Sequence, residues 1–561
     1  MRGWIPECSS TEDGKTVRRK DGKTVRRKDG RTSRSPSSSP ASAAWNERLR
    51  RTLVRQATLV LALAGPSVFP SFRPSVLVRP SALVGPSVLS AQSLARRLDA
   101  RLDAPPMDRN LWGVAVVDDK GGLRYGRNQR QLFIPASNTK IVVAAVASAL
   151  LPPDWTVKTS LYADGPVTNG VLQGDLVLYG RGDPTFGRRC FATDTVREGA
   201  CETDSYTRLR DLADGLRARG IREVHGDLVG DGSYFEPTLV HPGWETFDLN
   251  WWYAAPVSAL GFNDNSVDFT WGPGTAAGTP AVITMSPDVG DVTFENRTVT
   301  IPAGGESDIG DRFYREPGTL HVWAEGTVAL DKPTQTESFA MPDPNLFTAR
   351  ALRQVLAEAG IAITGTTRST TDSMRYRQAR TTPPLAEITS RPFREWVFPI
   401  LNRSQNWFAE MVLKQLGRQF GRAGSWDEGL AVERRFLIDS VRVDSTEFRL
   451  QDGSGLSSGN LVSPLAFTRI LRFIRSHPRA QTFMAGLPQS GNVGSLRTRF
   501  VGTPLEGRVR AKDGSIGGVN SLSGFIDRPD GKVWTCSVQA NHHTQPGRVA
   551  IQRIDSVVVE M

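Results

Sequence analysis

The sequence predicts an α/β (α+β) domain that is interrupted by a large β-rich insertion. From residue 111 onward, a strand hairpin is followed by a long Ala-rich helical run. Residues from about 164 to 380 are instead rich in Gly, Pro, Thr and short β-type segments, and helical patterns return near residue 383 before strands end the chain. We therefore expect one discontinuous domain over residues 93–163 and 381–561, with the insertion over residues 164–380.

The elements of the discontinuous domain follow from local patterns. A hairpin is expected over residues 111–128, and the helical run that starts at Pro135 ends before Pro152 and Pro153. The insertion carries one helical pattern, over residues 345–360. The last part is expected to contain amphipathic helices and then strands, over residues 406–421, 463–478, 509–514, 519–527 and 533–541.

Residues 1–92 are expected to form a disordered basic leader rather than a folded domain. The formal net charge of the chain is +11, and residues 1–55 hold 15 Lys/Arg against 6 Asp/Glu, so the remainder is nearly neutral. Composition therefore predicts no nucleic-acid partner. Arginines up to Arg55 precede an apolar run from residue 57 to 64, a pattern typical of a signal peptide that is cleaved near residues 90–92. The alternatives are a basic disordered tail or an over-extended start.

The apolar run of the leader is too short to span a bilayer, so no stable transmembrane anchor is expected. Cys190 and Cys201 flank a polar loop, and an exported protein permits a disulfide between them, with two free thiols as the alternative. Cys536 lies in an apolar alternating segment and is expected to be a buried, inert thiol. Six scattered histidines form no ligand pattern, so neither a metal nor a cofactor is expected.

Three short motifs carry candidate chemistry. Ser137 and Lys140 are three residues apart at the start of a helical run, where they share one face, and a lysine kept neutral by burial can accept the serine proton. Ser404 and Asn406 precede an amphipathic helix, and Lys512 and Gly514 lie on an expected strand. Taken singly, Ser137, Ser404 and Asn406 are better explained as helix caps and Lys512 as a solvated strand residue.

Together the motifs have the order Ser-x-x-Lys, Ser-x-Asn and Lys-x-Gly of the active-site-serine penicillin-interacting enzymes. The segments PASNTK, LVLYGRGDPTF, SALGFNDNSV and LQDGSGLSSGNLVSP resemble the D-alanyl-D-alanine carboxypeptidase/endopeptidase family, the class C low-molecular-mass penicillin-binding proteins. This resemblance covers residues from about 94 to the C-terminus. The long interval from Lys140 to Ser404 also agrees with this family, which inserts extra domains there.

The resemblance implies a serine penicillin-binding, transpeptidase-like domain and a role for each motif residue. Ser137 would be the acylated nucleophile and Lys140 its general base. Ser404 would pass a proton to the leaving amine, Asn406 would bind the substrate amide, and Lys512 would position the substrate carboxylate. The backbone N–H groups of Ser137 and Ser515 would form the oxyanion hole, and Gly514 would let a substrate backbone approach the strand.

One position departs from the family. Asp513 stands where the family usually has threonine, whose hydroxyl helps to bind the substrate carboxylate. An ionised Asp513 cannot donate a hydrogen bond and would repel that carboxylate. Either Asp513 pairs with a neighbouring cation and leaves the carboxylate to Ser515, or the enzyme prefers less negatively charged substrates. We favour the first, because Ser515 keeps a hydroxyl on the same strand.

The sequence therefore predicts a periplasmic or secreted serine peptidase that cleaves D-alanyl-D-amino-acid bonds of peptidoglycan peptides. β-Lactams are expected to act as its covalent inhibitors. A serine β-lactamase or esterase of the same superfamily is one alternative, which rapid β-lactam turnover would favour. A non-catalytic envelope scaffold is another, which a lack of labelling by penicillin would favour.

Overall fold

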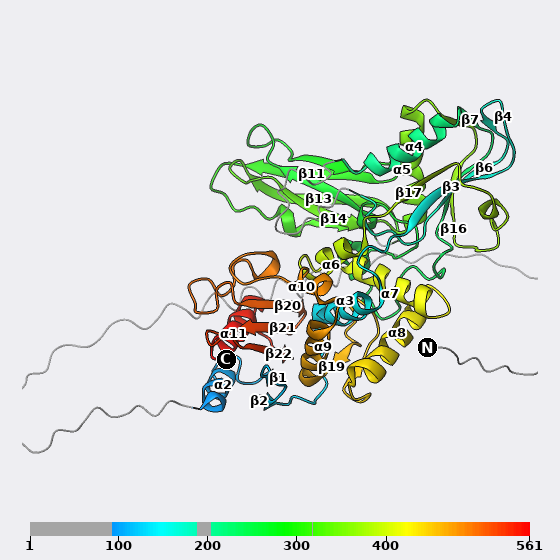
Figure 1. Cartoon of the computed structure of the whole chain (residues 1–561). Helices are drawn as coiled ribbons and strands as arrows, with labels where there is room; N and C mark the ends of the chain where they lie inside the picture. Colours follow the sequence, from blue (N-terminus) through cyan, green and yellow to red (C-terminus); the bar gives the residue numbers. More distant parts are fainter. Residues whose placement is uncertain (1–92, 188–203, 317) are drawn as a thin grey trace, which may run out of the picture. The chain divides into compact units, whose positions relative to one another are not determined.

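The computed structural model describes residues 93–187, 204–316 and 318–561 of the chain (Figure 1). All of them lie in one compact unit, which spans Leu89–Met561. The expected leader and signal peptide, and the expected disulfide between Cys190 and Cys201, lie outside the described residues. Cys536 is a buried free cysteine, as its apolar surroundings in the sequence predict.

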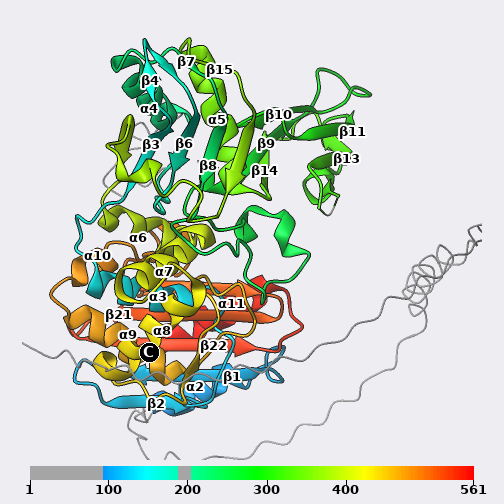
Figure 2. The ribbon, with the colours of Figure 1, turned by 90° about the vertical axis from the view of Figure 1, so that its right-hand side faces the viewer.

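A five-stranded antiparallel sheet is built from both ends of the described chain. Its strand order is β2-β1-β22-β21-β20. The blue strands from the beginning and the red strands from the end therefore lie side by side (Figure 2). The bounds are β1 (Leu111–Val117), β2 (Leu123–Arg127), β20 (Val509–Ile516), β21 (Val519–Asp527) and β22 (Val533–Asn541). Helices α2 (Leu94–Leu102) and α11 (Gly547–Val559) pack together and share a hydrophobic core with this sheet.

A helical layer packs beside this sheet and carries the first two motifs. At its centre lies α3 (Thr139–Leu150), which is buried along eleven of its twelve residues because, apart from Lys140, its side chains are apolar or small on every face. A short 3-10 turn, η1 (Ala136–Asn138), leads into α3 and packs against β20. The surrounding helices are α6 (Phe393–Leu401), α7 (Asn406–Phe420), α8 (Trp426–Phe436), α9 (Pro464–Ser476) and α10 (Ala480–Met484).

The insertion contains four sheets and two helices within its described residues. The central sheet has the order β16-β8-β6-β3-β17, with β3 (Lys158–Asp164), β6 (Asp175–Tyr179), β8 (Leu228–Asp231), β16 (Thr367–Thr370) and β17 (Ala386–Thr389). β3 and β17 lie almost entirely outside the predicted residues 164–380, yet they pair with each other in this sheet. Strand pairing therefore joins residues just outside the predicted bounds to the same sheet as residues within them.

The remaining sheets of the insertion are short. One has four strands: β4 (Val167–Thr168), β5 (Val171–Leu172), β7 (Glu223–Val224) and β15 (Ala362–Ile363). Two have three strands each: β9 (Ser266–Gly272), β10 (Val282–Ser286) and β14 (Gln335–Ala340), and β11 (Thr293–Ile301), β12 (Phe313–Arg315) and β13 (His321–Ala329). The helices are α4 (Thr207–Ala218), which the sequence analysis missed, and the predicted α5 (Pro344–Glu358).

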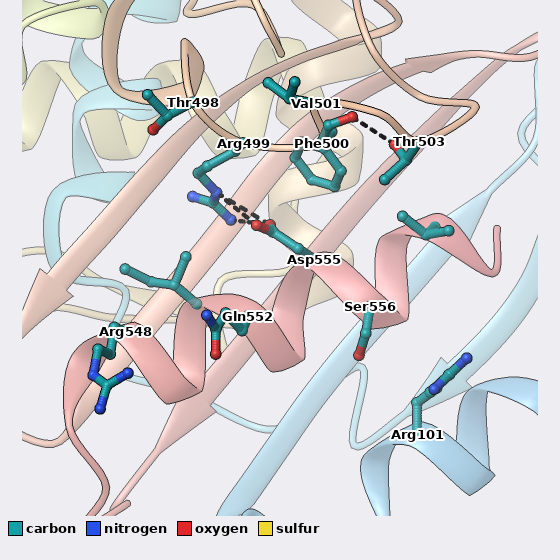
Figure 3. A pocket seen from close by; sticks show the side chains of 12 residues that line it. Arg101, Thr498, Arg499, Phe500, Val501, Thr503, Arg548, Gln552, Asp555 and Ser556 are labelled. Carbon is teal, nitrogen blue, oxygen red and sulfur yellow. Dashed lines mark hydrogen bonds and ion pairs between the residues drawn. The ribbon is translucent and has the colours of Figure 1, made fainter.

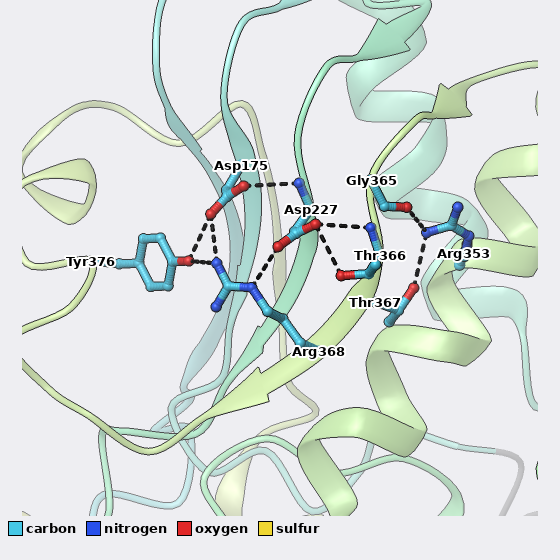
Figure 4. A network of polar contacts seen from close by, with 8 residues as sticks. All are labelled: Asp175, Asp227, Arg353, Gly365, Thr366, Thr367, Arg368 and Tyr376. Atoms are coloured by element: carbon cyan, nitrogen blue, oxygen red, sulfur yellow. Dashed lines mark hydrogen bonds and ion pairs between the residues drawn. The ribbon is translucent and has the colours of Figure 1, made fainter.

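A polar network ties the central sheet of the insertion together (Figure 4). Arg368 on β16 donates to Asp175 on β6 and to Asp227 just before β8, both at 2.7 Å. The Tyr376 hydroxyl donates to the same Asp175 at 2.8 Å. One guanidinium thus joins three neighbouring segments by charge-assisted hydrogen bonds, which are stronger than neutral ones.

Candidate active site

The first motif forms at the junction of η1 and α3. Lys140 in the first turn of α3 lies with its Nζ 3.0 Å from the Oγ of Ser137. Ala136, just before the serine, adopts a left-handed φ of 50°, which turns the chain sharply into the helix. The spacing of three residues thus brings amine and hydroxyl together, as the sequence predicts.

Lys140 is completely buried, and its amine has two further partners. Nζ lies 2.6 Å from Oδ1 of Asn406 and 2.7 Å from the carbonyl oxygen of Ser454. A neutral amine suits these three partners, because its two hydrogens can be donated to Asn406 and Ser454 while its lone pair faces the Ser137 hydroxyl. Burial first, and then the charge of Lys512, hold the pKa of Lys140 well below its ordinary value. The site therefore favours a neutral amine that is held in place and can accept a proton from Ser137.

The second motif lies at the beginning of α7. Ser404 has a left-handed φ of 58°, and Asn406 is the first residue of the helix. The N-cap is Gln405, whose side chain accepts from the backbone N–H of Trp407 at 3.0 Å, so neither motif residue is needed as the cap. Asn406 uses both ends of its amide, since Oδ1 accepts from Lys140 and Nδ2 donates to the Tyr253 carbonyl at 2.7 Å.

Residues of the insertion support this end of α7. Gln405 donates to the Asp264 carboxylate at 2.6 Å, and the Trp407 indole donates to the Pro256 carbonyl at 3.2 Å. With the Tyr253 carbonyl on Asn406, these contacts come from one insertion segment. The insertion therefore helps to fix the residue that holds Lys140.

The third motif lies on β20, directly beside η1. An ideal Cβ placed on Gly514 would lie 2.6 Å from the Pro135 carbonyl oxygen and 2.9 Å from the Ser137 nitrogen. Glycine is therefore required for the strand to approach the nucleophile this closely. Lys512 is 1% exposed, and its Nζ donates to the backbone carbonyl and the carboxylate of Asp513 at 2.6 and 2.9 Å.

The three motifs meet at a cavity of about 530 Å³. Its walls include Ser137, Ser404, Asn406 and Ser515, which come from η1, the turn before α7, α7 and β20. Insertion residues, among them Asp248, also line it. A serine hydroxyl, a buried amine beside it and a strand edge that contains a glycine meet at one cavity, an arrangement suited to acyl transfer.

Asp513 lies beside this cavity without lining it. Its carboxylate accepts from Lys512 at 2.9 Å and from the Ser495 hydroxyl at 2.5 Å. Burial raises the pKa of Asp513, but the charge of Lys512, the hydrogen bonds from Ser495 and Lys512 and the charge of Arg499 together outweigh burial, and the net pKa is below the ordinary value. The geometry agrees with the first expectation for Asp513, because it is paired with a cation while Ser515 faces the cavity.

A second positive group near Asp513 is Arg499, which also lowers its pKa. Arg499 lines a separate hollow of about 480 Å³, where its Nε lies 3.1 and 3.2 Å from the two carboxylate oxygens of Asp555 (Figure 3). The acid at position 513 is thus one member of a row of alternating charges, Lys512, Asp513, Arg499 and Asp555. Its charge is neutralised within the protein.

We expect Asp513→Thr to change the preference between acid and amide substrates by less than about tenfold, or under ~1.4 kcal/mol. The reason is that the Asp513 carboxylate is paired with Lys512 and lies outside the cavity wall. The measurement is kcat/KM on a pentapeptide ending in D-Ala-D-Ala and on its C-terminal amide. A larger swing toward the free acid would show that Asp513 faces the substrate.

We expect Gly514→Ala to lower the acylation rate by about 10²-fold, because the new methyl group must push η1 and the nucleophile out of place. Acylation by a fluorescent penicillin, with the thermal midpoint measured in parallel, checks this. Gly547→Ala is the matched control, since Gly547 lies outside the cavity wall and only Asn520 Oδ1, at 3.9 Å, lies within 4 Å of its ideal Cβ position among the described residues. Wild-type acylation in Gly514→Ala would contradict the close approach.

Several contacts of the site were not predicted from the sequence. The Ser454 carbonyl, which accepts from Lys140, is a backbone atom and leaves no signal in a residue pattern. Glu410 accepts a hydrogen bond from the backbone of Ser454. The sequence could have indicated this residue, because it follows Asn406 by four positions and so lies on the same face of the helix. The DGSGLS segment, residues 452–457, forms a tight loop that lines the cavity with Gly455 and Leu456, and an ideal Cβ on Gly455 would lie 1.9 Å from the Ala136 carbonyl oxygen.

Comparison with known proteins identifies the family. The family model of D-Ala-D-Ala carboxypeptidase 3 (S13) matches residues 94–560. The chain belongs to the S13 family. It is 31% identical over 482 residues to a D-alanyl-D-alanine carboxypeptidase of Actinomadura sp. (strain R39), covering 83% of this chain and 84% of that protein.

Other S13 relatives agree with this assignment. The D-alanyl-D-alanine carboxypeptidase DacB of Haemophilus influenzae is 24% identical over 441 residues, covering 76% of this chain and 84% of that protein. The crystal structure of penicillin binding protein 4 (dacB) from Haemophilus influenzae has a TM-score of 0.68 at 22% identity, covering 82% of this chain and 98% of that one. The predicted family and fold class are thereby confirmed. The S13 chain is a serine-type D-Ala-D-Ala carboxypeptidase/endopeptidase, a hydrolase.

Proposed function

We propose that this S13 enzyme works through an acyl-enzyme on Ser137, with Lys140 as the general base. The observation that carries the proposal is the 3.0 Å contact between Lys140 Nζ and Ser137 Oγ, at a lysine whose pKa is held well below its ordinary value. Lys140 takes the hydroxyl proton as Oγ attacks the carbonyl carbon of the penultimate D-alanine. The peptide C–N bond then breaks, and the acyl group stays on Ser137.

The other motif residues supply the remaining steps. The backbone N–H groups of Ser137 and Ser515 stabilise the oxyanion, a contribution of about 3–4 kcal/mol per donor in other acyl-transfer enzymes. Ser404, which lines the cavity, passes a proton to the departing amine. Water then hydrolyses the ester and restores Ser137.

The geometry changes the role proposed for Asn406 and leaves the one proposed for Lys512. Asn406 was expected to bind the substrate amide, but its side-chain amide already bonds Lys140 and Tyr253. We therefore propose that Asn406 orients Lys140 first and contacts a substrate only by exchanging its Tyr253 partner. Lys512 and Ser515 are proposed to receive the substrate carboxylate, and Gly514 gives it access to the strand.

The proposed substrates are the stem peptides of peptidoglycan, and β-lactams are the proposed covalent inhibitors. Support for the second comes from the Haemophilus influenzae penicillin binding protein 4, which has been solved in complex with a β-lactam. A β-lactam presents a reactive carbonyl to Ser137 and leaves no separate amine to diffuse away. We also propose a location in the cell envelope, reached by the signal peptide expected in residues 1–92. Among the described residues, no helix is both long and apolar enough to cross a membrane.

The test is a pair of substrates presented to the purified enzyme. A stem pentapeptide ending in D-Ala-D-Ala reports carboxypeptidase activity through released D-alanine, and a cross-linked peptide dimer reports endopeptidase activity through released monomer. We expect hydrolysis of at least one, blocked by prior treatment with penicillin. Lack of turnover on both, in protein that penicillin labels fully, would contradict the proposed substrates.

A further inference from the structure

Three buried carboxyl groups lie behind the cavity, and the proposed reaction uses none of them. They belong to Glu410 on α7, Glu433 on α8 and Asp452, and all three residues have no exposed surface. Burying an acid is costly unless hydrogen bonds compensate it. The partners of each carboxyl therefore indicate what it does.

Glu410 joins α7 to the turn that contacts Lys140. Its Oε1 accepts from the Ser454 N–H at 2.7 Å, and its Oε2 accepts from the Gly453 N–H at 3.1 Å and from the Trp426 indole at 2.8 Å. The carbonyl of the same Ser454 accepts from Lys140 at 2.7 Å. A continuous chain of hydrogen bonds thus leads from Glu410 through Ser454 to the proposed base.

Asp452 bonds backbone groups within its own turn instead of joining the turn to a helix. Its Oδ1 accepts from the Gly455 N–H and its Oδ2 from the Ser457 N–H, both at 2.7 Å. These bonds close the turn on itself and give it its shape. Glu410 attaches this closed turn to α7. It follows Asn406 by four residues on that helix, and Asn406 bonds Lys140 directly.

We propose that Glu410 is a positioning residue, which holds the Ser454 carbonyl against Lys140 and supplies a negative charge beside that base. The inference rests on the proposed role of Lys140. Glu410 itself does not line the cavity or contact the substrate site. It acts only through the turn and through its charge.

The charges around Glu410 determine in which direction its loss should shift the pKa of Lys140. Burial and then Asp452 raise the pKa of Glu410 to about 7, against the three hydrogen-bond donors, which lower it. Glu433, Lys140 and Lys414 are the other ionisable groups that interact with it. An ionised Glu410 raises the pKa of Lys140 and opposes the effect of burial. Loss of that charge should therefore lower the pKa of Lys140 further.

Glu433 provides a matched control. It is equally buried, but neither of its carboxyl oxygens has a hydrogen-bond partner among the described residues. Burial first, and then the neighbouring acids Glu410 and Asp452, raise its pKa well above the ordinary value, which favours the neutral form of the carboxyl group. Glu433→Gln therefore replaces this carboxyl group by a neutral amide of similar size, without touching the turn.

The experiment compares Glu410→Gln and Glu433→Gln in the full chain. The readout is the second-order rate constant of acylation by a fluorescent penicillin between pH 5 and 10, with the thermal midpoint of each variant. For Glu410→Gln we expect the plateau rate to fall by about 10- to 100-fold and its acid limb to move to lower pH. For Glu433→Gln we expect a plateau within threefold of wild type and an unmoved limb.

The outcomes separate the inference from the proposed function. An acylation rate within threefold of wild type for Glu410→Gln would overturn the positioning role. So would an equal fall in rate for both variants, if the acid limb of the pH profile stays at its wild-type position. If Lys140→Met acylates at the wild-type rate, the proposed base itself is wrong, whatever Glu410→Gln does. Should Glu410→Gln fail to fold, Trp426→Phe removes a single donor to Oε2. It is expected to slow acylation two- to fivefold at pH 7, and an unchanged rate would overturn the inference.

Discussion

Replacing Ser137 by Ala is expected to abolish covalent labelling by penicillin and to lower kcat on a D-Ala-D-Ala peptide by about 10⁴-fold or more. The reason is that the Oγ next to Lys140 is the atom that forms the acyl bond. Labelling is measured by intact mass, and turnover by released D-alanine. The fold should persist, because loss of one partly exposed hydroxyl changes the free energy of unfolding by no more than about 1 kcal/mol.

Ser148→Ala is the matched control for this change. Ser148 lies on α3, the helix that follows η1, is completely buried, and its hydroxyl has no hydrogen-bond partner among the described residues. This variant should be labelled to the same stoichiometry as wild type. A stable penicillin adduct on Ser137→Ala would mean that another residue is the nucleophile.

Replacing Lys140 by Met is expected to lower the acylation rate by about 10²- to 10⁴-fold, the range over which a positioned general base acts. Without the amine, the Ser137 hydroxyl has no base within hydrogen-bond reach. Asn406 and the Ser454 carbonyl also lose their shared donor, so a fall in stability of about 1–3 kcal/mol should accompany the change. Stopped-flow labelling and thermal unfolding measure the two effects.

The matched control for Lys140→Met is Lys414→Met. Lys414 on α7 is also completely buried, but its Nζ bonds the Thr238 and Val257 carbonyls and Glu236 instead of the nucleophile. We expect acylation within about threefold of wild type at a comparable loss of stability. An equally large fall in acylation for both lysines would show that the effect is one of stability, and Lys140 would lose its role as base.

Much of the site was predictable because it depends on spacing within single segments. Ser137 and Lys140 meet through one turn of chain, and the helical run around them has a clear pattern that ends at Pro152. The hairpin from residue 111, α5 and the last three strands were predicted for the same reason. Helix α4 was missed although Leu209, Leu212 and Leu216 have helical spacing, because the surrounding Gly- and Pro-rich composition favoured strands.

What the sequence by itself determined was the family, the fold class and the spacing that brings Ser137 and Lys140 together, because these depend on local patterns. Only the tertiary structure decided how the Lys140 amine is held. Lys140 bonds Asn406 and Ser454, which follow it by 266 and 314 positions, and no local pattern encodes which backbone carbonyl will face a lysine. The same holds for the pairing of β3 with β17 and for the Ser495 hydroxyl on Asp513, because such contacts are chosen by packing between segments distant in the sequence.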